Sequence, residues 1–169
     1  MDNLNDILSS KYNDNFFKST NTYQKTLNEK GILVLTDFIS KKILNSMVDE
    51  AVRLKSQSFK SASEYNVYVK PRDLSYPIKS ARNRIMKTTK KCIANDFIPE
   101  QSFLMQIYNS VKIKSFFCDL LGVSNLYSYS DNLSSVNINY YDPGDALGWH
   151  FDNSDFTITL LIKNCSKGG

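Results

Sequence analysis

Apolar residues recur at helical spacing in three segments of this chain. These segments are residues 41–55, 101–109 and 111–121. In the first, Ile43, Met47 and Ala51 form a stripe with most charged residues on the opposite side, which predicts a helix that packs on a core through one face. Gly122 stands where a C-terminal capping glycine belongs. Residues 1–30 are polar with weak periodicity and predict one or two short helices.

Other segments carry patterns that are typical of strands. Before Gly122 they are residues 31–39, 64–69 and 92–98, and after it residues 126–130, 136–141, 147–152 and 156–163. Residues 56–63 are rich in Ser and Lys and predict a loop. Helices followed by closely spaced strands predict a single α+β domain. Residues 1–122 would form its helix-rich support and residues 123–169 the first strands of a jelly-roll or barrel sheet.

The composition is that of an ordinary globular protein. Of the 169 residues, 41% are hydrophobic and 22% charged, which favours one domain with its own core. No apolar run approaches the ~20 residues of a membrane helix, and the N-terminus lacks a signal-peptide pattern. The three cysteines have no metal-type spacing and indicate reduced thiols in a cytoplasmic protein. The net charge of +4 permits an anionic substrate without demanding nucleic acid.

The chemistry of the sequence centres on His150, the only histidine of the chain, and on Asp152 two residues later. Residues i and i+2 of a strand point to the same face, so both side chains can reach one point from a single element. An imidazole and a carboxylate placed in this way are two of the three ligands that non-haem Fe(II) oxygenases use. We therefore expect both to bind iron, although a short match of this kind often has only a structural explanation.

The sequence around these two residues resembles the Fe(II)/2-oxoglutarate-dependent dioxygenases. The resemblance lies in Asn139-x-Tyr141-x-Pro143-Gly144-x5-His150-x-Asp152, in the apolar run that follows, and in Gly168-Gly169. It implies a double-stranded β-helix, a form of jelly roll, in which His150 and Asp152 bind Fe(II). It also implies that Asn139 and Tyr141 contact 2-oxoglutarate, the cosubstrate consumed together with O2.

The run from Leu147 to Leu161 is similar to a bacterial group of this superfamily that hydroxylates or halogenates free amino acids. Halogenating members have glycine or alanine in place of Asp152, which leaves a coordination position for chloride. The carboxylate of Asp152 therefore favours hydroxylation. The substrate implied by this resemblance is small and polar, such as a free amino acid.

Three further residues are candidates for substrate binding. In the same group an arginine ahead of the β-helix binds the substrate carboxylate, which points to Arg82 or Arg84. Asn153 could reach a substrate amine, although turn formation is the commoner role of such a side chain. Both arginines lie in the basic stretch 79–91, which is most often a solvated surface. A phosphate-binding face is the last of its three interpretations.

The family also needs a second histidine ligand and a later basic residue for the far carboxylate of 2-oxoglutarate. After Asp152 the basic residues are only Lys163 and Lys167, and no histidine follows. We therefore expect a fragment of a longer enzyme with an incomplete β-helix, or a truncated relative. Two other functions stay open: a nucleic-acid demethylase of the alkylation-repair type, and an inactive β-helix that serves as an interaction domain. A homodimer is also compatible with the sequence.

Overall fold

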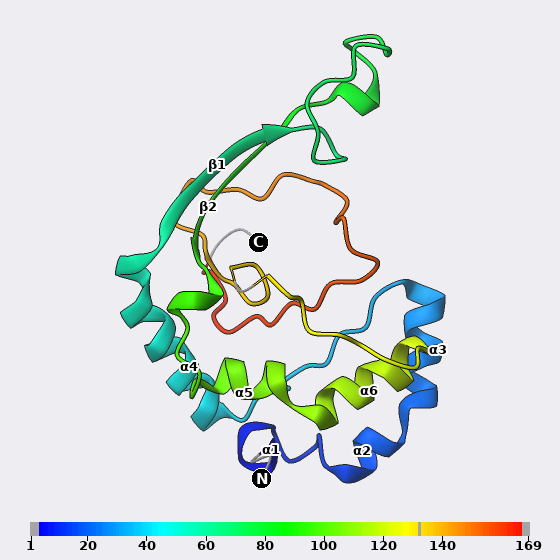
Figure 1. Ribbon diagram of the computed structural model, residues 1–169, viewed down its shortest axis with the longest axis vertical. Coiled ribbons are helices and arrows are strands. Elements are labelled where there is room, and N and C mark those ends of the chain that lie inside the picture. Colours follow the sequence, from blue (N-terminus) through cyan, green and yellow to red (C-terminus); the bar gives the residue numbers. More distant parts are fainter. Residues whose placement is uncertain (1–3, 132, 167–169) are drawn as a thin grey trace. The chain divides into compact units, whose positions relative to one another are not determined.

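A computed structural model describes residues 4–131 and 133–166. The chain divides into two compact units, which we call the helical unit (residues 1–53 and 95–136) and the sheet unit (residues 54–94 and 137–169). Helices together with a small antiparallel sheet confirm the mixed α and β class (Figure 1). None of the described helices is both long and apolar enough to cross a membrane. That the two units belong to one domain stays a prediction.

Capping residues define the helices of the helical unit. The helices are α1 (Leu4–Ile7), α2 (Asp14–Lys18), α3 (Thr20–Lys30), α4 (Lys41–Leu54, whose last residue belongs to the sheet unit), η3 (Asn95–Phe97), α5 (Phe103–Asn109) and α6 (Val111–Leu121). The Ser110 hydroxyl accepts a hydrogen bond from the Ile113 backbone nitrogen at the start of α6. Gly31 and Gly122 end α3 and α6 with φ of 68°, a conformation that favours glycine. The predicted helices 41–55, 101–109 and 111–121 are confirmed as α4, α5 and α6, whereas residues 4–30, expected to form one or two short helices, contain three.

The core of the helical unit is rich in aromatic rings. Phe116 on α6 is 2% exposed, and its ring centroid lies 5.0 Å from that of Phe16 and 5.5 Å from that of Phe17. The predicted stripe on α4 is buried and consists of Ile43, Met47 and Ala51. Removal of these apolar side chains from water is the main term that stabilises the unit.

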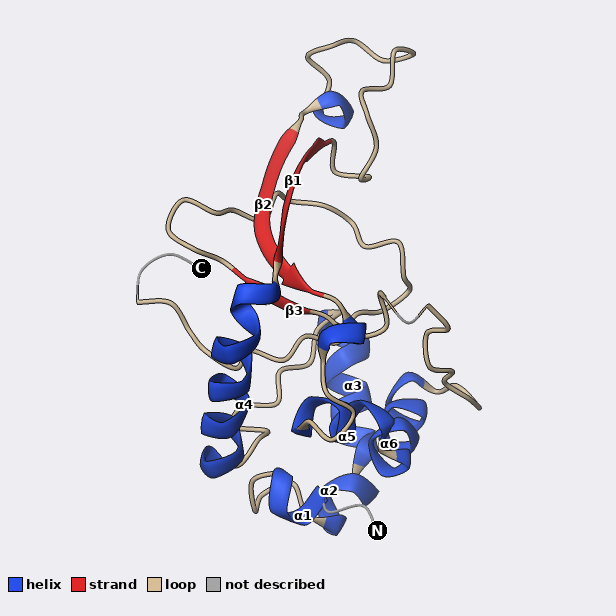
Figure 2. Cartoon of the chain, turned by 60° about the vertical axis from the view of Figure 1, so that its left-hand side comes forward, coloured by secondary structure: helices blue, strands red, loops and turns tan. Residues whose placement is uncertain are grey.

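The described part of the sheet unit contains one three-stranded antiparallel sheet, ordered β1-β2-β3 (Figure 2). Its strands are β1 (Phe59–Tyr65), β2 (Met86–Ile93) and β3 (Ile138–Tyr140), and the 3-10 helices η1 (Lys55–Gln57) and η2 (Ala81–Asn83) precede β1 and β2. The register of the β1–β2 hairpin pairs Phe59 with Cys92 at one end and Tyr65 with Met86 at the other. Cys92 also pairs with Asn139 of β3.

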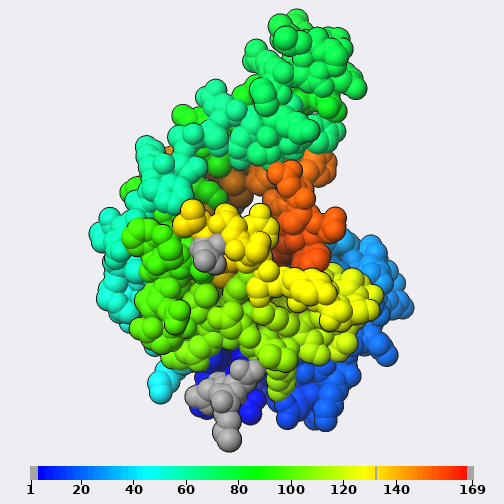
Figure 3. Space-filling model, viewed as in Figure 1, coloured from blue at the N-terminus to red at the C-terminus, as the bar shows by residue number. Residues whose placement is uncertain are grey.

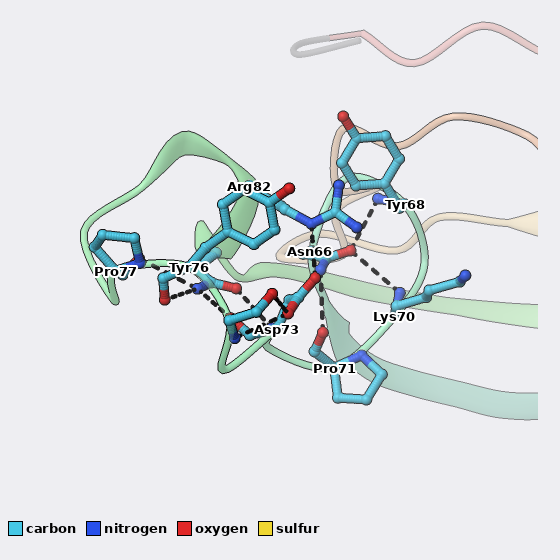
Figure 4. A network of polar contacts seen from close by, with 10 residues as sticks. Asn66, Tyr68, Lys70, Pro71, Asp73, Tyr76, Pro77 and Arg82 are labelled. Carbon is cyan, nitrogen blue, oxygen red and sulfur yellow. Dashed lines mark hydrogen bonds and ion pairs between the residues drawn. The ribbon is translucent and has the colours of Figure 1, made fainter.

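The hairpin loop, residues 66–85, is ordered by two buried asparagines. Asn66 is 2% exposed and Asn83 is 3% exposed. Asn66 Oδ1 accepts hydrogen bonds from the backbone nitrogens of Tyr68 and Lys70 (Figure 4). The side-chain nitrogen of Asn83 donates to the carbonyls of Asp73, Tyr76 and Pro77. These amides satisfy backbone groups that have no strand partner, so the loop is a built structure. Figure 3 shows it as a knob at the end of the hairpin.

Several strand predictions are wrong in detail. Residues 56–63, predicted as a loop, contain most of β1. β1 and β2 end at Tyr65 and Ile93, so segments 64–69 and 92–98 are strand only in their first two residues. Segment 31–39 contributes only a bridge between Ile39 and Leu8. A strand needs a pairing partner, which the alternation of residues along one segment does not identify.

The predicted strands after Gly122 have mixed outcomes. Segment 136–141 is confirmed as β3. Segments 126–130, 147–152 and 156–163 join no ladder within the described residues. The jelly roll therefore stays a prediction. Gly168 and Gly169, which carry part of the family resemblance, lie outside the described residues.

Candidate functional site

His150 and Asp152, which we call the His–Asp pair, lie together in the sheet unit, with His150 Nε2 3.3 Å from Asp152 Oδ1. His150 Nδ1 lies 2.7 Å from the carbonyl oxygen of Gly148, to which it can only donate. A neutral imidazole that donates through Nδ1 carries its lone pair on Nε2. That lone pair and the Asp152 Oδ1 oxygen then face each other and repel. A cation between Nε2 and Oδ1, either a proton or a metal ion, makes their close approach favourable.

The carboxylate of the pair is oriented by Thr157. The Thr157 hydroxyl donates a 2.6 Å hydrogen bond to Asp152 Oδ2, and the Ser154 hydroxyl lies 3.3 Å from the Thr157 hydroxyl. Oδ1 is therefore the oxygen that faces the imidazole. The side chain of Asp152 is 49% exposed and that of His150 is 22% exposed, so a ligand can reach the pair from solvent.

Gly148 brings the segment before His150 against β2. The Gly148 backbone nitrogen donates a 2.9 Å hydrogen bond to the hydroxyl of Thr88. A Cβ at Gly148 would come within 2.7 Å of Met86 Cβ and 3.1 Å of the Lys87 carbonyl oxygen, so the approach requires glycine. Neither Gly148 nor Thr88 was predicted as a site residue. A glycine inside a strand-like run is a signal of close backbone approach and could have identified Gly148.

Two more contacts hold the segment that carries the His–Asp pair. The backbone nitrogen of Phe151 donates a 2.7 Å hydrogen bond to the Val67 carbonyl. The Phe151 ring stacks on the ring of Tyr68, with centroids 5.6 Å apart. The ring of Tyr65 on β1 meets the imidazole of His150 edge-on, with centroids 6.0 Å apart. The pair is thus fixed to the β1–β2 hairpin although its own segment is not a strand.

Arg82, a predicted substrate-binding residue, lies in the hairpin loop and forms an ion pair with Asp73, whose Oδ2 accepts from Arg82 Nε at 3.0 Å (Figure 4). The guanidinium carbon lies 4.9 Å from the ring centroids of both Tyr68 and Tyr76. Within the described residues the guanidinium has no ion pair with Asp152. Tyr68 also stacks on Phe151, so ring contacts connect Arg82 to the residue between His150 and Asp152.

Arg84 and Asn153, the other two predicted substrate-binding residues, are exposed. The backbone nitrogen of Arg84 donates to the Ala81 carbonyl at the end of η2. Asn153 directly follows the His–Asp pair in a bend. Within residues 4–131 and 133–166, no hydrogen bond or ion pair joins either of these side chains to Arg82.

Asn139 and Tyr141, the predicted 2-oxoglutarate contacts, are both exposed, whereas Ile138 beside them is buried. This alternation places them on one face, as the period of two predicts. Burial raises the pKa of the Tyr141 hydroxyl, and the Cys92 and Tyr65 groups add to the rise.

The turn before the pair is held by an ion triad. The Asp145 nitrogen donates to the Asp142 carbonyl at 2.9 Å, and Gly144 has φ of 91°, so residues 142–145 form a turn. The Asp142 carboxylate accepts hydrogen bonds from Lys55 Nζ at 2.6 Å and Lys91 Nζ at 2.7 Å. These two bonds lower the pKa of Asp142 to about 2.

The donor atoms of the His–Asp pair suit a first-row divalent metal. Two donors bound at right angles, each with a bond of about 2.1 Å, lie about 3 Å apart, close to the 3.3 Å between Nε2 and Oδ1. Across residues 4–131 and 133–166, His, Cys, Asp and Glu side chains form no group of three or more that could hold a metal ion. The described residues thus offer two of the three protein ligands of a facial triad.

A family model described as Halogenase D matches residues 17–169. The matched range includes all predicted site residues, from Arg82 to Asn153. No curated protein and no solved structure matches the chain.

Proposed function

The chain belongs to the Halogenase D family, and from that premise we propose that it is an Fe(II)- and 2-oxoglutarate-dependent oxygenase that hydroxylates a small polar substrate such as a free amino acid. The family match by itself fits a halogenase-like oxygenase. The observation that carries the more specific proposal is the His–Asp pair, whose donor atoms lie 3.3 Å apart while Nδ1 of the imidazole is engaged by a carbonyl.

In this proposal His150 binds the metal through Nε2 and Asp152 binds it through Oδ1. The third ligand of such a triad is usually a second histidine. The sequence contains one histidine, so the third ligand is not a histidine of these 169 residues. When bound, iron with O2 and 2-oxoglutarate supplies the oxidising chemistry. The share of the protein is to hold the two donors in place through Gly148 and Thr157.

Hydroxylation, and not halogenation, is the proposed reaction because Asp152 carries a carboxylate. A carboxylate that binds the metal occupies the position that chloride needs. In the balanced reaction, substrate C–H, O2 and 2-oxoglutarate give the substrate C–OH, succinate and CO2. One oxygen atom enters the new hydroxyl group and the other enters succinate.

Arg82 is the residue we propose for the substrate carboxylate. Nε of the guanidinium donates to Asp73, and the guanidinium carbon lies 4.9 Å from the ring centroids of both Tyr68 and Tyr76. This arrangement leaves the terminal edge of the fork for a second carboxylate, which a guanidinium binds through two parallel hydrogen bonds. We propose Asn139 and Tyr141 as the contacts of 2-oxoglutarate. Among the described residues, no ion pair or cation–π contact holds the side chain of Arg84, and no hydrogen bond holds that of Asn153.

Anaerobic titration of the protein with Fe(II), with the heat of binding measured by calorimetry, tests the metal proposal. We expect saturable binding to the wild-type chain, and loss of that binding in His150→Ala and in Asp152→Ala. Asp155→Ala is the matched control, because Asp155 is an exposed carboxylate three residues after Asp152. Equal binding by wild type and both pair variants would refute the proposed metal site.

Turnover tests the reaction class. The wild-type chain is incubated with Fe(II), 2-oxoglutarate and a panel of free amino acids in chloride buffer, and succinate and the substrate product are measured by mass spectrometry. We expect a product with one added oxygen for some members of the panel. A chlorinated product from the wild-type chain would show that Asp152 does not exclude chloride. Specific metal binding without succinate release from any member would favour either the inactive-domain alternative or a third ligand that lies outside these 169 residues.

A further inference from the structure

We propose that Thr88 is a positioning residue for His150, and that with Tyr65 it fixes the imidazole in the tautomer whose Nε2 is available to a metal ion. This inference rests on the proposed function, because it assigns a role to residues behind the proposed metal ligand. The Thr88 hydroxyl does not contact the imidazole. It acts through the peptide group of Gly148.

Thr88 on β2 is bonded to the peptide group of Gly148. Thr88 is 3% exposed, and its Oγ1 accepts a 2.9 Å hydrogen bond from the Gly148 nitrogen. A buried backbone nitrogen without a partner is costly, so this bond determines where the segment lies along β2. The contact is close because Gly148 has no side chain: a Cβ there would lie 3.1 Å from Thr88 Oγ1 itself.

Gly148 also contacts the imidazole of His150. The Gly148 carbonyl oxygen lies 2.7 Å from His150 Nδ1. A carbonyl accepts only, so Nδ1 must carry the proton and Nε2 the lone pair. Partners of this kind set both the tautomer and the ring orientation of metal-binding histidines. Thr88 therefore influences which nitrogen of His150 carries the proton, and it does so through the peptide groups of Gly148.

Tyr65 contacts both Thr88 and the imidazole ring of His150. The Tyr65 hydroxyl lies 2.8 Å from Thr88 Oγ1, so Tyr65 and Gly148 both bond the same oxygen. The ring of Tyr65 also meets the imidazole at an interplanar angle of 74° with centroids 6.0 Å apart. Tyr65 thus limits the rotation of both the Thr88 hydroxyl and the His150 ring.

The tautomer of His150 can be measured without any metal. Because the chain contains a single histidine, an untagged protein labelled with 15N-histidine gives one imidazole spin system. Long-range 1H–15N correlation spectra in alkaline buffer distinguish Nδ1–H from Nε2–H. We expect the metal-free wild-type chain to show the Nδ1–H form, although a histidine in water prefers Nε2–H.

Three substitutions then separate positioning from general stability. Thr88→Val has nearly the same shape without the hydroxyl, and we expect it to move the population toward Nε2–H. Thr88→Ser restores the hydroxyl and should restore the wild-type tautomer. Thr89→Val is the matched control: Thr89 is the next residue of β2, and its hydroxyl accepts from the Ala146 nitrogen instead. It should leave the tautomer unchanged.

Metal affinity gives the second readout. Titration with Co(II), whose visible spectrum reports its coordination, should show affinity reduced by about 10- to 100-fold in Thr88→Val and little change in Thr88→Ser. If Thr88→Val does not fold, Tyr65→Phe replaces it, and a smaller tautomer shift in the same direction is expected.

The outcomes distinguish this inference from the proposed function. An unchanged Nδ1–H tautomer in folded Thr88→Val, or in Tyr65→Phe if that variant has to replace it, overturns the positioning role. So does an Nε2–H wild type. A tautomer shift in Thr88→Val, together with a wild-type chain that binds neither Co(II) nor Fe(II), supports the positioning role and overturns the proposed function.

Discussion

The hydroxyl of Thr157 donates a 2.6 Å hydrogen bond to Oδ2 of Asp152. This bond joins a residue of the unpaired segment 156–163 to the carboxylate of the His–Asp pair. Because Oδ2 is engaged, Oδ1 is the oxygen that faces the imidazole at 3.3 Å. The orientation of the carboxylate therefore depends on a residue that the sequence analysis assigned only to a strand.

Substitution Thr157→Val should weaken metal binding. Loss of the hydroxyl frees the carboxylate to rotate, and we expect Co(II) affinity to fall by about 10- to 100-fold, the usual effect of removing an outer partner. Thr157→Ser keeps the hydroxyl and should remain within a few-fold of wild type. Equal loss of affinity in both variants would show that the methyl group matters and the hydrogen bond does not.

Substitution Asp152→Gly should make metal binding depend on chloride. Without the carboxylate, a coordination position opens, and chloride can occupy it. We expect weaker Co(II) affinity than wild type in chloride-free buffer and a partial recovery as chloride is added at constant ionic strength. The wild-type chain, measured in parallel, should show no such recovery. A chloride effect of the same size in both would contradict the assignment of Asp152 as a ligand.

Substitution Gly148→Ala should displace the segment that carries the His–Asp pair. The new Cβ would meet Met86 Cβ at 2.7 Å and the backbone oxygen of Lys87 at 3.1 Å. Backbone cannot yield as a flexible side chain can, so the hydrogen bond to Thr88 should be lost. We expect a destabilisation of roughly 1–3 kcal/mol, as for overpacking, together with loss of the Nδ1–H tautomer of His150. Urea denaturation and the 15N-histidine spectrum measure the two effects.

Asp142 should make stability depend on pH in the acid range. Its hydrogen bonds with Lys55 and Lys91 lower the pKa to about 2, below the usual value near 3.9 for the unfolded chain. The stabilisation is therefore present above about pH 4 and is lost as the pH falls toward 2. We expect wild type to exceed Asp142→Asn in urea midpoint at pH 6, with the gap closing toward pH 2. A gap that persists unchanged at pH 2 would contradict the ion triad.

Substitution Phe116→Ala should destabilise the helical unit. The side chain is 2% exposed and contacts the rings of Phe16 and Phe17, so we expect a loss of about 3–5 kcal/mol in the free energy of unfolding. Phe117→Ala is the control, since Phe117 is the next residue of α6 and is only half-buried; its effect should be clearly smaller. Urea denaturation followed by far-UV circular dichroism measures both.

The helices were predictable because their signals are local. The stripe on α4 and the glycine that ends α6 lie within a few residues of the structure they determine. β1 was missed for the opposite reason. Its sequence, Phe59-Lys-Ser-Ala-Ser-Glu-Tyr65, contains no β-branched residue and is a strand because β2 pairs with it along its whole length.

The site was predictable only in part. The spacing of His150 and Asp152 was sufficient to predict that the two side chains meet, although their segment is not a strand. The supporting residues Thr88 and Thr157 reach the pair through tertiary contacts, and no spacing rule identifies them. Arg82 and Arg84 were singled out through the resemblance to the amino-acid hydroxylases, whereas the ion pair of Arg82 with Asp73 could be seen only in the folded loop.

The register of β2 against β1 has a consequence for how this chain can vary. Successive residues of a strand alternate between its faces, so the side that Thr88 presents to Gly148 is set by counting residues along the ladder. A single-residue insertion or deletion in β2 ahead of Thr88 would exchange the two sides and offer a lysine or Thr89 in its place. A change of length by one residue would therefore remove the support behind His150 altogether.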